Sequence, residues 1–391
     1  MKTILFISHK MNLGGTEKAL LSLLNALQKE QLQLTLLLCE RGGVLESQIP
    51  NFVTVKYLKD FDKMKPVVED PPQQTFFRFL KNYQLYSALS LLLTYIIIKI
   101  SGNWYHNYRK VLRQTPHFGT YDIAIAFAGP ADFISYFVLK KVHAQKKIQW
   151  IHFDIEKVLR DYNFGNRFYS SFDQVFCVSQ SAKDNFLKHF PQLTAKTEVF
   201  HNIVSGPEMT KCSNEGSTFI DDFKGIRVLT VGRLTREKGQ HLIPEVVARL
   251  KAENFEFQWY LVGDGTERYS IEQITAELHV QEHLIFLGEK INPYPYMKDC
   301  DIYVQPSLHE GYGITVAEAQ VFNKPIVVTN FASAKDLIIN NETGLICEIS
   351  SEGIYEAVKS LLINSDLQTK FIANSLYITS EKAENISKLL N

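Results

Sequence analysis

Short, continuously apolar segments alternate with longer stretches of helical periodicity along nearly the whole chain of 391 residues. Continuous apolar runs of this length are typical of parallel strands that helices cover on both faces. The alternation occurs twice and predicts an α/β protein of two doubly wound, Rossmann-like domains. The predicted strands are 3–8, 34–39, 53–58, 122–127, 148–152, 174–178, 198–201, 227–231, 258–263, 284–287, 302–305, 326–329 and 344–347.

Charge is distributed unevenly between the two halves of the chain. Lys plus Arg and Asp plus Glu both total 42, so net charge gives no reason to expect a nucleic-acid partner. Residues 1–204 hold 25 basic and 16 acidic residues, hence +9, and the remainder holds 17 and 26, hence −9. The opposite signs predict two domains that face different partners. The five cysteines form no CxxC pair, which favours neither disulfides nor zinc and fits a reducing cytoplasm.

A polar stretch at 205–224 divides the two halves. It contains Gly206-Pro207 and lacks a strong periodicity, so we expect a linker there. The predicted domains are 1–205 and 206–391, and the sequence leaves open whether the last helix packs back on the first domain. Nucleotides usually bind beyond the carboxyl ends of parallel strands, so the expected site is a cleft between the two domains.

Residues 71–121 interrupt this pattern, because the segment contains no Asp or Glu. It holds six Lys and Arg residues and many aromatic side chains around the apolar run 89–98. That composition fits a helix lying in an anionic membrane interface, and the alternative is a helical insertion packed on the first domain. No apolar run reaches the ~18–20 residues of a transmembrane helix, so we expect a cytoplasmic, peripheral protein at the inner face of the cell membrane.

A glycine-bearing turn follows the first strand of each half. Gly14 and Gly15 stand where a helical pattern begins. Glycines expose the backbone, and a helix N-terminus offers free N–H groups, so an anion could bind there. The alternative is a strand-to-helix turn that binds no ligand, which is the more common case. Arg233 and Lys238 lie in the loop after strand 227–231, where cations can meet a diphosphate. The alternative for both cations is a solvated loop charge, which we expect for their neighbour Arg236.

Glu310 and Glu318 stand on either side of a loop-to-helix transition, with seven residues between them. Glu310 follows strand 302–305, and Glu318 falls about one turn into a helix that begins near Ile314, so both carboxylates can point into one cleft. Carboxylates accept hydrogen bonds from vicinal hydroxyl groups, and the amides of the two intervening glycines can donate to a sugar or phosphate oxygen. Helix capping and a favourable first-turn acid are the alternative roles.

The order of these segments resembles that of the retaining glycosyltransferases of family 4, which have the GT-B fold and an E-x7-E motif. The similarity rests on Gly14-Gly15, the Gly-Arg-Leu…Lys-Gly segment at 232–239, residues 261–265 and the segment 306–318. It covers nearly the whole chain except 71–121. The resemblance implies a GT-B fold and a retaining glycosyltransferase activity.

The resemblance also implies a role for each matching residue of the second domain. Arg233 and Lys238 bind the donor's diphosphate and stabilise it as it leaves. Glu310 contacts the donor hexose, and Glu318 holds the ribose hydroxyl groups. The backbone amides implied to lie near the donor hexose are those of Gly311, Tyr312 and Gly313.

Further roles implied by the resemblance concern the first domain and the base. Gly14 and Gly15 bring the backbone against the phosphate and the acceptor. His152 ends strand 148–152 and matches a family histidine near the donor sugar, and a buried structural histidine is the alternative. The loop at Lys290 and Ile291 meets the nucleobase, largely through backbone groups.

The implied reaction transfers a hexose or N-acetylhexosamine from a nucleotide sugar, with UDP favoured, to a lipid-linked or cell-envelope glycan. We expect it to need no metal and no cofactor, because Arg233, Lys238 and helix N-termini supply positive charge. A metal-dependent alternative would use Asp299-Cys300-Asp301 or Asp60-Phe61-Asp62, which fit a DxD pattern. A GT-B sugar-nucleotide epimerase, a GT-B phosphorylase and a non-catalytic GT-B partner subunit are the remaining alternatives.

Overall fold

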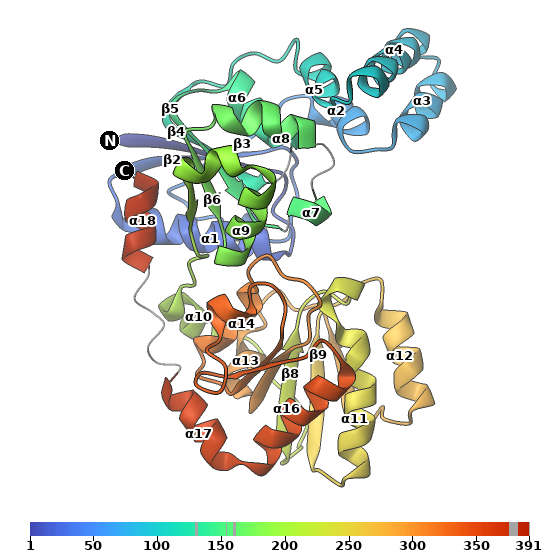
Figure 1. Cartoon of the computed structure of the whole chain (residues 1–391), viewed down its shortest axis with the longest axis vertical. Coiled ribbons are helices and arrows are strands. Elements are labelled where there is room, and N and C mark those ends of the chain that lie inside the picture. The colour runs from blue at the N-terminus through green and yellow to red at the C-terminus, as the bar shows by residue number, and fades with distance from the viewer. Residues whose placement is uncertain (130–131, 154, 159–161, 375–381, 391) are drawn as a thin grey trace. The chain divides into compact units, whose positions relative to one another are not determined.

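The computed structural model describes residues 1–129, 132–153, 155–158, 162–374 and 382–390. The chain divides into two compact units, Met1–Val178 with Ala182–Phe200, and Ser179–Ser181 with His201–Asn391. Each unit contains one parallel sheet with helices packed against it (Figure 1). The two units are described separately below.

The first unit is built on a parallel sheet of seven strands in the order β3-β2-β1-β4-β5-β6-β7, counted over the described residues. The strands are β1 (Lys2–Ser8), β2 (Leu32–Leu38), β3 (Thr54–Tyr57), β4 (Thr120–Gly129), β5 (His143–Ile151), β6 (Gln174–Cys177) and β7 (Thr197–Val199). The helices of this part of the chain are α1 (Gly15–Ala26), α2 (Phe61–Val68), α3 (Pro72–Lys81), α4 (Leu85–Ser101), α5 (Tyr105–Val111), α6 (Asp132–Lys141), α7 (Ile155–Val158), α8 (Tyr162–Phe168) and α9 (Gln180–His189).

The core of the first unit follows from the apolar strands predicted from the sequence. Leu5 and Ile7 of β1 point to the face where Phe133 and Phe137 of α6 are buried. Fully burying a side chain of this size contributes about 1.5–3 kcal/mol. Because neighbouring residues of a strand point to opposite faces, Phe6 is buried on the other face of the same sheet.

The second unit repeats the topology with six described strands in the order β10-β9-β8-β11-β12-β13. The strands are β8 (Ile226–Val231), β9 (Phe257–Val262), β10 (Leu284–Gly288), β11 (Ile302–Gln305), β12 (Ile326–Thr329) and β13 (Leu345–Cys347). The helices of this part are α10 (Gly206–Ser213), α11 (Ile243–Ala252), α12 (Arg268–Glu277), α13 (Tyr294–Asp299), α14 (Ile314–Gln320), α15 (Ala334–Leu337), α16 (Ser351–Ile363), α17 (Ser365–Asn374) and α18 (Lys382–Leu390). The second unit has two core clusters. Val228 packs in the one that contains α11 and α16, and its neighbour Leu229 packs in the one that contains α13 and α14.

Each predicted strand segment coincides with a strand of the structure, which confirms the two doubly wound Rossmann-like sheets. β5 begins at His143, five residues before the predicted start. The polar residues 143–147 pair only with β4, because pairing with β6 begins at Ile148. The stretch 205–224, where a linker was expected, contains a helix that the sequence did not predict: Pro207 lies in the first turn of α10, which buries Met209 and Ser213.

The strand orders place a reversal of winding between β1 and β4 and between β8 and β11. In open parallel sheets, ligands bind beyond the carboxyl ends of the strands at such a reversal. The segment 71–121 forms α3, α4 and α5, and α4 packs against both of the other two. Within the described residues, none of the helices combines the length and apolar character needed to cross a membrane.

Candidate functional site

Two loops meet at the carboxyl ends of the neighbouring strands β8 and β11. Gly239 has a φ of +73°, and a Cβ at this position would overlap the carbonyl oxygen of Pro306. The backbone N–H groups of Leu308 and His309 donate to the carbonyl oxygen of Glu237, at 2.8 and 3.2 Å. The glycine and these bonds fix the loop after β8 against the loop after β11.

The contact between these loops brings Lys238 to Glu310. The ammonium nitrogen of Lys238 donates to both carboxylate oxygens of Glu310, at 2.7 and 2.8 Å. The side chains are 21% and 8% exposed, so the pair lies largely out of water while one edge stays accessible. A charge-assisted pair of this kind holds both groups in one geometry.

A chain of buried hydrogen bonds fixes Glu310 from the other side. The Ser307 hydroxyl donates to Glu310 Oε1 at 2.8 Å, and the side-chain amide of Gln305 donates to Ser307 at 2.8 Å. Tyr303 and Thr315 both donate to Gln305 Oε1, at 2.8 and 3.0 Å. The network leaves the carboxylate little freedom to turn, because each of its members is itself hydrogen bonded.

Arg233 lies in the same loop as Lys238, but the structure does not bring it to Glu310. Its side chain is 63% exposed, and its guanidinium lies 3.9 Å from the carboxylate of Glu237. The backbone of Arg233 is held, since its carbonyl oxygen accepts a hydrogen bond from Gln240. The geometry therefore fixes the start of this side chain and leaves its charged end in solvent.

Glu318 lies in α14, which begins at Ile314 as predicted, and only 2% of this residue is exposed. The Tyr294 hydroxyl donates to Glu318 Oε1 at 3.0 Å. Burial and the neighbouring Glu318 carboxylate raise the pKa of Tyr294 well above its usual range, which keeps the hydroxyl protonated as a donor. Burial raises the pKa of Tyr303 strongly, and the charges of Glu318 and Glu310 add to this, so its hydroxyl stays protonated as a donor to Gln305.

The remaining residues predicted to bind the donor sugar lie in the loop between β11 and α14. Gly313 has a φ of +91° and stands directly before α14, where a Cβ would crowd Leu337. The carbonyl oxygens of Glu310 and Tyr312 accept hydrogen bonds from the Ser333 hydroxyl, at 3.4 and 3.1 Å. These bonds hold the backbone on both sides of Gly311.

The loop after β10 carries Lys290, which is partly buried, and Ile291, which is 52% exposed. The next residue anchors this loop: the side-chain amide of Asn292 donates to the carbonyl oxygens of Cys212 and Glu215, at 2.7 and 2.9 Å. The anchored loop leaves the apolar side chain of Ile291 open to a ligand. The structure shows no contact between Lys290 or Ile291 and the pair Lys238–Glu310.

His152 of the first unit directly follows β5 and is 5% exposed. The centre of its ring lies 4.5 Å from the ring centre of Phe127. The ring is also stacked on Trp150, with the two ring centres 6.0 Å apart. Burial lowers the pKa of His152 to about 3, outweighing a hydrogen bond with the Phe127 backbone, so the ring is neutral at pH 7. Within the described residues, its Nε2 atom has no hydrogen-bond partner. The neutral ring therefore supplies no positive charge to a diphosphate.

Gly14 and Gly15 stand at the start of α1, as predicted. A Cβ on Gly14 would meet the carboxylate of Glu17, which therefore folds back over this turn. Lys18 closes the first turn by donating its N–H to the Gly14 carbonyl oxygen at 3.0 Å. An anion that approaches the turn must displace the Glu17 carboxylate, because both occupy the positive end of the helix.

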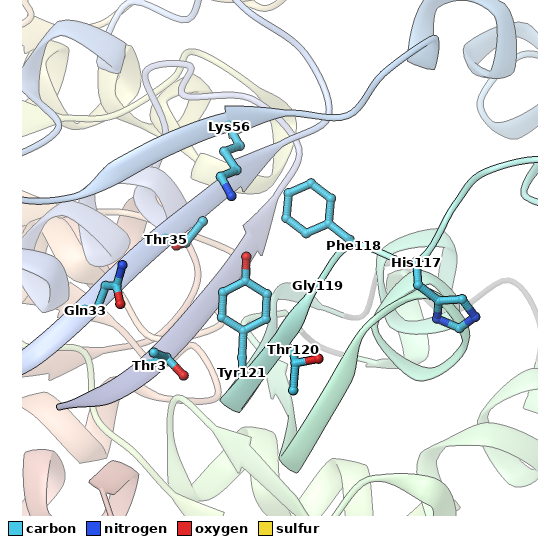
Figure 2. Close-up of a pocket in the computed structure, with 9 residues that line it drawn as sticks. All are labelled: Thr3, Gln33, Thr35, Lys56, His117, Phe118, Gly119, Thr120 and Tyr121. Carbon is cyan, nitrogen blue, oxygen red and sulfur yellow. The ribbon is translucent and has the colours of Figure 1, made fainter.

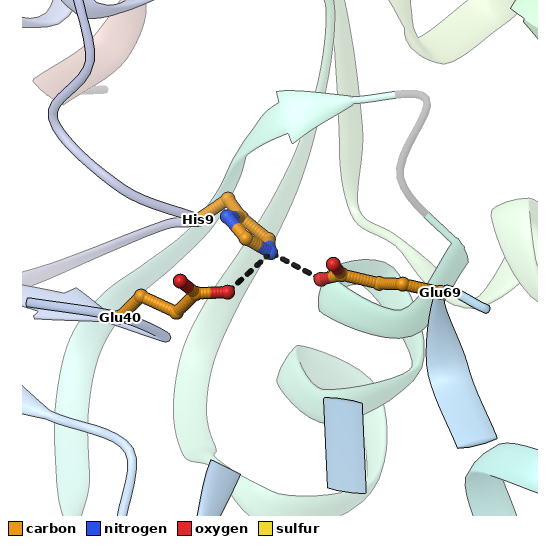
Figure 3. Close-up of side chains that lie close together, drawn as sticks. All are labelled: His9, Glu40 and Glu69. Atoms are coloured by element: carbon orange, nitrogen blue, oxygen red, sulfur yellow. Dashed lines mark hydrogen bonds and ion pairs between the residues drawn. The ribbon is translucent and has the colours of Figure 1, made fainter. Parts of the chain in front are cut away.

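His9, Glu40 and Glu69 form the candidate metal cluster of the described residues, with donor atoms within 4.8 Å of one another (Figure 3). His9 Nε2 pairs with Glu69 and lies 3.8 Å from Glu40. The ammonium of Lys65 lies 2.5 Å from Glu40 Oε1. Burial raises the pKa of Glu40, but Lys65 and His9 outweigh it and hold this pKa below its usual value. Lys65 thus supplies the positive charge that a metal ion would bring.

The two DxD segments lie at different places: Asp299–Asp301 stands before β11, at the amino ends of the strands, and Asp60–Asp62 follows the carboxyl end of β3. The Asp301 carboxylate accepts the N–H of Arg227 at 2.7 Å, at the amino end of β8, and Asp299 ends α13. Asp60 precedes α2 and pairs with Lys63 at 2.6 Å. Asp301 therefore anchors the opposite edge of the sheet from Glu310.

A cavity of about 430 Å³ lies in the first unit, at the amino ends of β1, β2 and β4 (Figure 2). Thr3, Gln33 and Thr120 line it from these three strands, and Lys56 reaches over it from β3. The cavity is at the opposite edge of the sheet from His152 and Gly14. It contains none of the residues predicted from the sequence.

Three residues of the site were missed by the sequence analysis. Ser307 stood in the motif at 306–318, but nothing in the sequence showed that its hydroxyl reaches Glu310. Gln305 could have been noticed, because it is a polar residue that ends an apolar strand and is fully buried. No local sequence pattern marks Tyr294, because its contact with Glu318 joins two different helices, α13 and α14.

Comparison with known proteins gives a family match for part of the chain and a fold match for all of it. Residues 221–376 match the family model for glycosyl transferases group 1. The Anabaena Alr3699/HepE structure in complex with UDP-glucose superimposes with a TM-score of 0.68 at 18% identity, covering 99% of this chain and 100% of the other. The chain has the GT-B fold.

Among curated proteins, a similar sequence is a Campylobacter jejuni transferase whose name is N-acetylgalactosamine-N,N'-diacetylbacillosaminyl-diphospho-undecaprenol 4-alpha-N-acetylgalactosaminyltransferase. It is 25% identical over 205 residues, which are 52% of this chain and 54% of the relative. The Rhizobium meliloti lipopolysaccharide core biosynthesis glycosyltransferase LpsE is 29% identical over 144 residues, 37% of this chain and 41% of the relative. The matches thus span about half of these relatives or less.

Proposed function

We propose that this GT-B protein is a retaining glycosyltransferase that moves a hexose or N-acetylhexosamine from a nucleotide sugar, with UDP favoured, to a lipid-linked or cell-envelope glycan. The observation that carries the proposal is the Lys238–Glu310 pair, held at the carboxyl ends of β8 and β11 by Gly239 and the Ser307 network. The group 1 match at 221–376 and the UDP-glucose complex of a protein of the same fold support it.

The proposed chemistry follows from the charges in these loops. The bond between the anomeric carbon and the diphosphate oxygen breaks, and the nucleoside diphosphate leaves with the electron pair. Lys238 and the exposed guanidinium of Arg233 stabilise the charge that grows on the diphosphate. The acceptor hydroxyl oxygen bonds to the anomeric carbon on the face that the diphosphate leaves, and its proton passes to the departing phosphate oxygen.

Glu310 and Glu318 bind the donor in this proposal. Glu310 accepts hydrogen bonds from hexose hydroxyl groups while Lys238 and Ser307 hold it in place. Glu318 accepts from the ribose, with Tyr294 fixing its other oxygen. Backbone groups near Gly311, Tyr312 and Gly313 line the hexose, and the loop at Lys290 and Ile291 meets the base.

The first unit contributes the acceptor surface in this proposal, with Gly14, Gly15 and His152 at the carboxyl ends of its strands. We also propose that the reaction needs no metal ion, since the Asp299–Asp301 segment lies at the other edge of its sheet. The peripheral location at the inner face of the membrane is likewise a proposal. It is supported by the undecaprenol-linked substrate in the name of the Campylobacter jejuni relative and by the acid-free segment 71–121.

A melting screen with UDP, GDP, ADP and their sugars tests the donor, because a ligand that binds only the folded state raises the melting temperature. We expect one nucleoside diphosphate to raise it, and its sugar to be transferred in the presence of chelator. Loss of transfer on chelation that magnesium or manganese restores would contradict the metal-free reaction. Isomerisation of the sugar nucleotide alone, or cleavage of a glycan by phosphate, would contradict a transferase.

A further inference from the structure

Helix α4 exposes a continuous apolar face. The exposed side chains follow the 3.6-residue repeat of one helix face, with no charged residue among them. They are Leu85, Tyr86, Leu89, Leu92, Leu93, Ile96, Ile97 and Ile100. A helix that is apolar on every side is normally buried in a protein core or in lipid.

The opposite face of α4 is already used by the fold. Ala88, Leu91 and Ile98 are buried there, where α4 packs against α3 and α5. In Figure 1 these helices stand at the edge of the first unit, away from its sheet. The exposed face therefore has no role in the core of this unit.

Helix α3, which packs against α4, and the turn between them also carry exposed apolar side chains. Phe77 is 67% exposed and Tyr83 is 92% exposed, and Ile100 at the far end of α4 is 82% exposed. An exposed apolar helix face of this length indicates an interaction site, because soluble proteins rarely leave a large apolar patch uncovered. We call this surface, formed by the exposed apolar residues of α3, α4 and the turn at Tyr83, the α3–α4 face.

The charges within the segment that forms the α3–α4 face have one sign, and the acid that pairs with it, Asp70, precedes the segment and lies 2.9 Å from Arg78. No Asp or Glu occurs from Pro71 to Tyr121. Lys81 in the last turn of α3 and Lys99 in the last turn of α4 are exposed beside the face. Lys99 also lies 5.5 Å from the ring centre of Tyr95, so its charge stays at the apolar border.

We propose that the α3–α4 face docks on an anionic lipid bilayer, with the apolar side of α4 among the acyl chains and Lys81 and Lys99 at the lipid phosphates. Apolar side chains bordered by basic ones match such a surface in both polarity and charge. The 17 residues of α4 span about 26 Å, less than the ~30 Å of a hydrocarbon core, so the helix lies in the interface. This inference makes the proposed membrane location specific and does not depend on the transfer reaction.

A second copy of the chain is the competing occupant of the α3–α4 face. In a symmetric dimer the same patch meets itself, so Lys81 and Lys99 would face the basic residues of the other copy. The segment 71–121 offers no acid to pair with them. A bilayer with anionic headgroups supplies the opposite charge, and this favours lipid as the occupant.

Flotation of the full chain with vesicles tests the proposal without any sugar substrate. The vesicles are phosphatidylcholine alone and phosphatidylcholine mixed with phosphatidylglycerol. We expect binding to the mixed vesicles that weakens at high salt, and at least a tenfold loss of partitioning in Leu93→Ser/Ile97→Ser. The matched control Ile220→Ser/Ile363→Ser removes two exposed isoleucines of the second unit and should bind as the wild type does.

The charges are tested separately by Lys81→Gln/Lys99→Gln, with Lys224→Gln/Lys370→Gln as the control pair of exposed lysines elsewhere. Each lysine near an anionic surface should change partitioning by about fivefold. Equal binding by the Leu93→Ser/Ile97→Ser variant and its control would overturn the proposal. A wild-type dimer in sedimentation that these serines disperse, with no vesicle binding, would assign the face to a second copy. Because each substituted residue is exposed, an unchanged melting temperature verifies that the variants fold.

Discussion

The two sheets share one topology, yet the loops at their carboxyl ends differ in how firmly they are built. In the second unit, Lys238 and Glu310 form a largely buried pair that a hydrogen-bond network fixes in place. In the first unit, His9 and Glu69 form a pair whose side chains are 39% and 32% exposed. Exposed pairs are worth little and rearrange readily, whereas a buried network holds one geometry. This difference fits the proposal of a fixed nucleotide site in the second unit and an adaptable acceptor surface in the first.

The largest effect is expected from removing the cation of the buried pair. Lys238→Ala should lower turnover about 10²–10³-fold, the usual loss when one preorganised charge is removed from a developing anion. Arg233→Ala should act in the same direction. Steady-state transfer measures both, with circular dichroism to verify folding.

The matched control for these two variants is Arg236→Ala, which removes an exposed cation from the same loop. Its turnover should stay near that of the wild type. Similar losses in all three variants would mean that general loop charge, and not the fixed pair, supports the reaction.

A smaller effect is expected from loosening Glu310 while leaving its charge in place. Ser307→Ala removes one hydrogen bond to the carboxylate, which for a charged group is worth about 1.5–3 kcal/mol. If Ser307 positions Glu310, kcat should fall about tenfold or more while the affinity for the nucleoside diphosphate alone stays unchanged. A loss of nucleotide affinity with kcat unchanged would instead assign Ser307 to binding.

The free energy of unfolding of the chain should depend on pH through the buried His152 of the first unit. His152 has a pKa of about 3 when folded, against ~6.5 for an exposed histidine, so the unfolded chain binds more protons between these values. Stability from this residue is therefore complete above about pH 6.5 and falls by about 1.4 kcal/mol per pH unit below it.

Urea unfolding at several pH values checks this prediction by comparing the wild type with His152→Gln. The variant lacks the titrating ring, so its free energy of unfolding should fall less steeply than that of the wild type as the pH drops. Parallel curves would show that His152 does not carry this dependence.

The smallest effect is expected at the exposed pair of the first unit. Glu69→Gln should lower the free energy of unfolding by less than about 1 kcal/mol, since exposed ion pairs seldom contribute more. The difference should shrink further at high salt. If Glu69→Gln lowered the free energy of unfolding as much as breaking a buried pair does, the two units would not differ in how firmly these pairs are held.

The sequence predicted the elements whose signal is local. Continuous apolar runs located the strands, and the spacing of Glu310 and Glu318 across a glycine loop located the helix that begins at Ile314. Contacts between distant segments were harder to predict. The Lys238–Glu310 pair was expected to share a site, but its direct contact depends on the approach of Gly239 to Pro306.

Other features of the site depend on side-chain directions that no local pattern encodes. The hydroxyl groups of Ser307 and Tyr294 reach the two glutamates only once the fold is complete. Helix α10 was missed because a polar helix with two buried residues gives almost no periodicity. Of the two alternatives for 71–121, a packed insertion describes the buried face of α4, and the membrane interface stays a prediction for its exposed face.

The most direct test of the central claim is titration calorimetry with the nucleoside diphosphate found by the melting screen and with its nucleoside. The ratio of the two Kd values isolates what the diphosphate contributes to binding. The account predicts that this ratio falls about tenfold or more in Lys238→Ala and in Arg233→Ala, and stays unchanged in Arg236→Ala. An unchanged ratio in Lys238→Ala would contradict the claim that Lys238, held beside Glu310, binds the diphosphate.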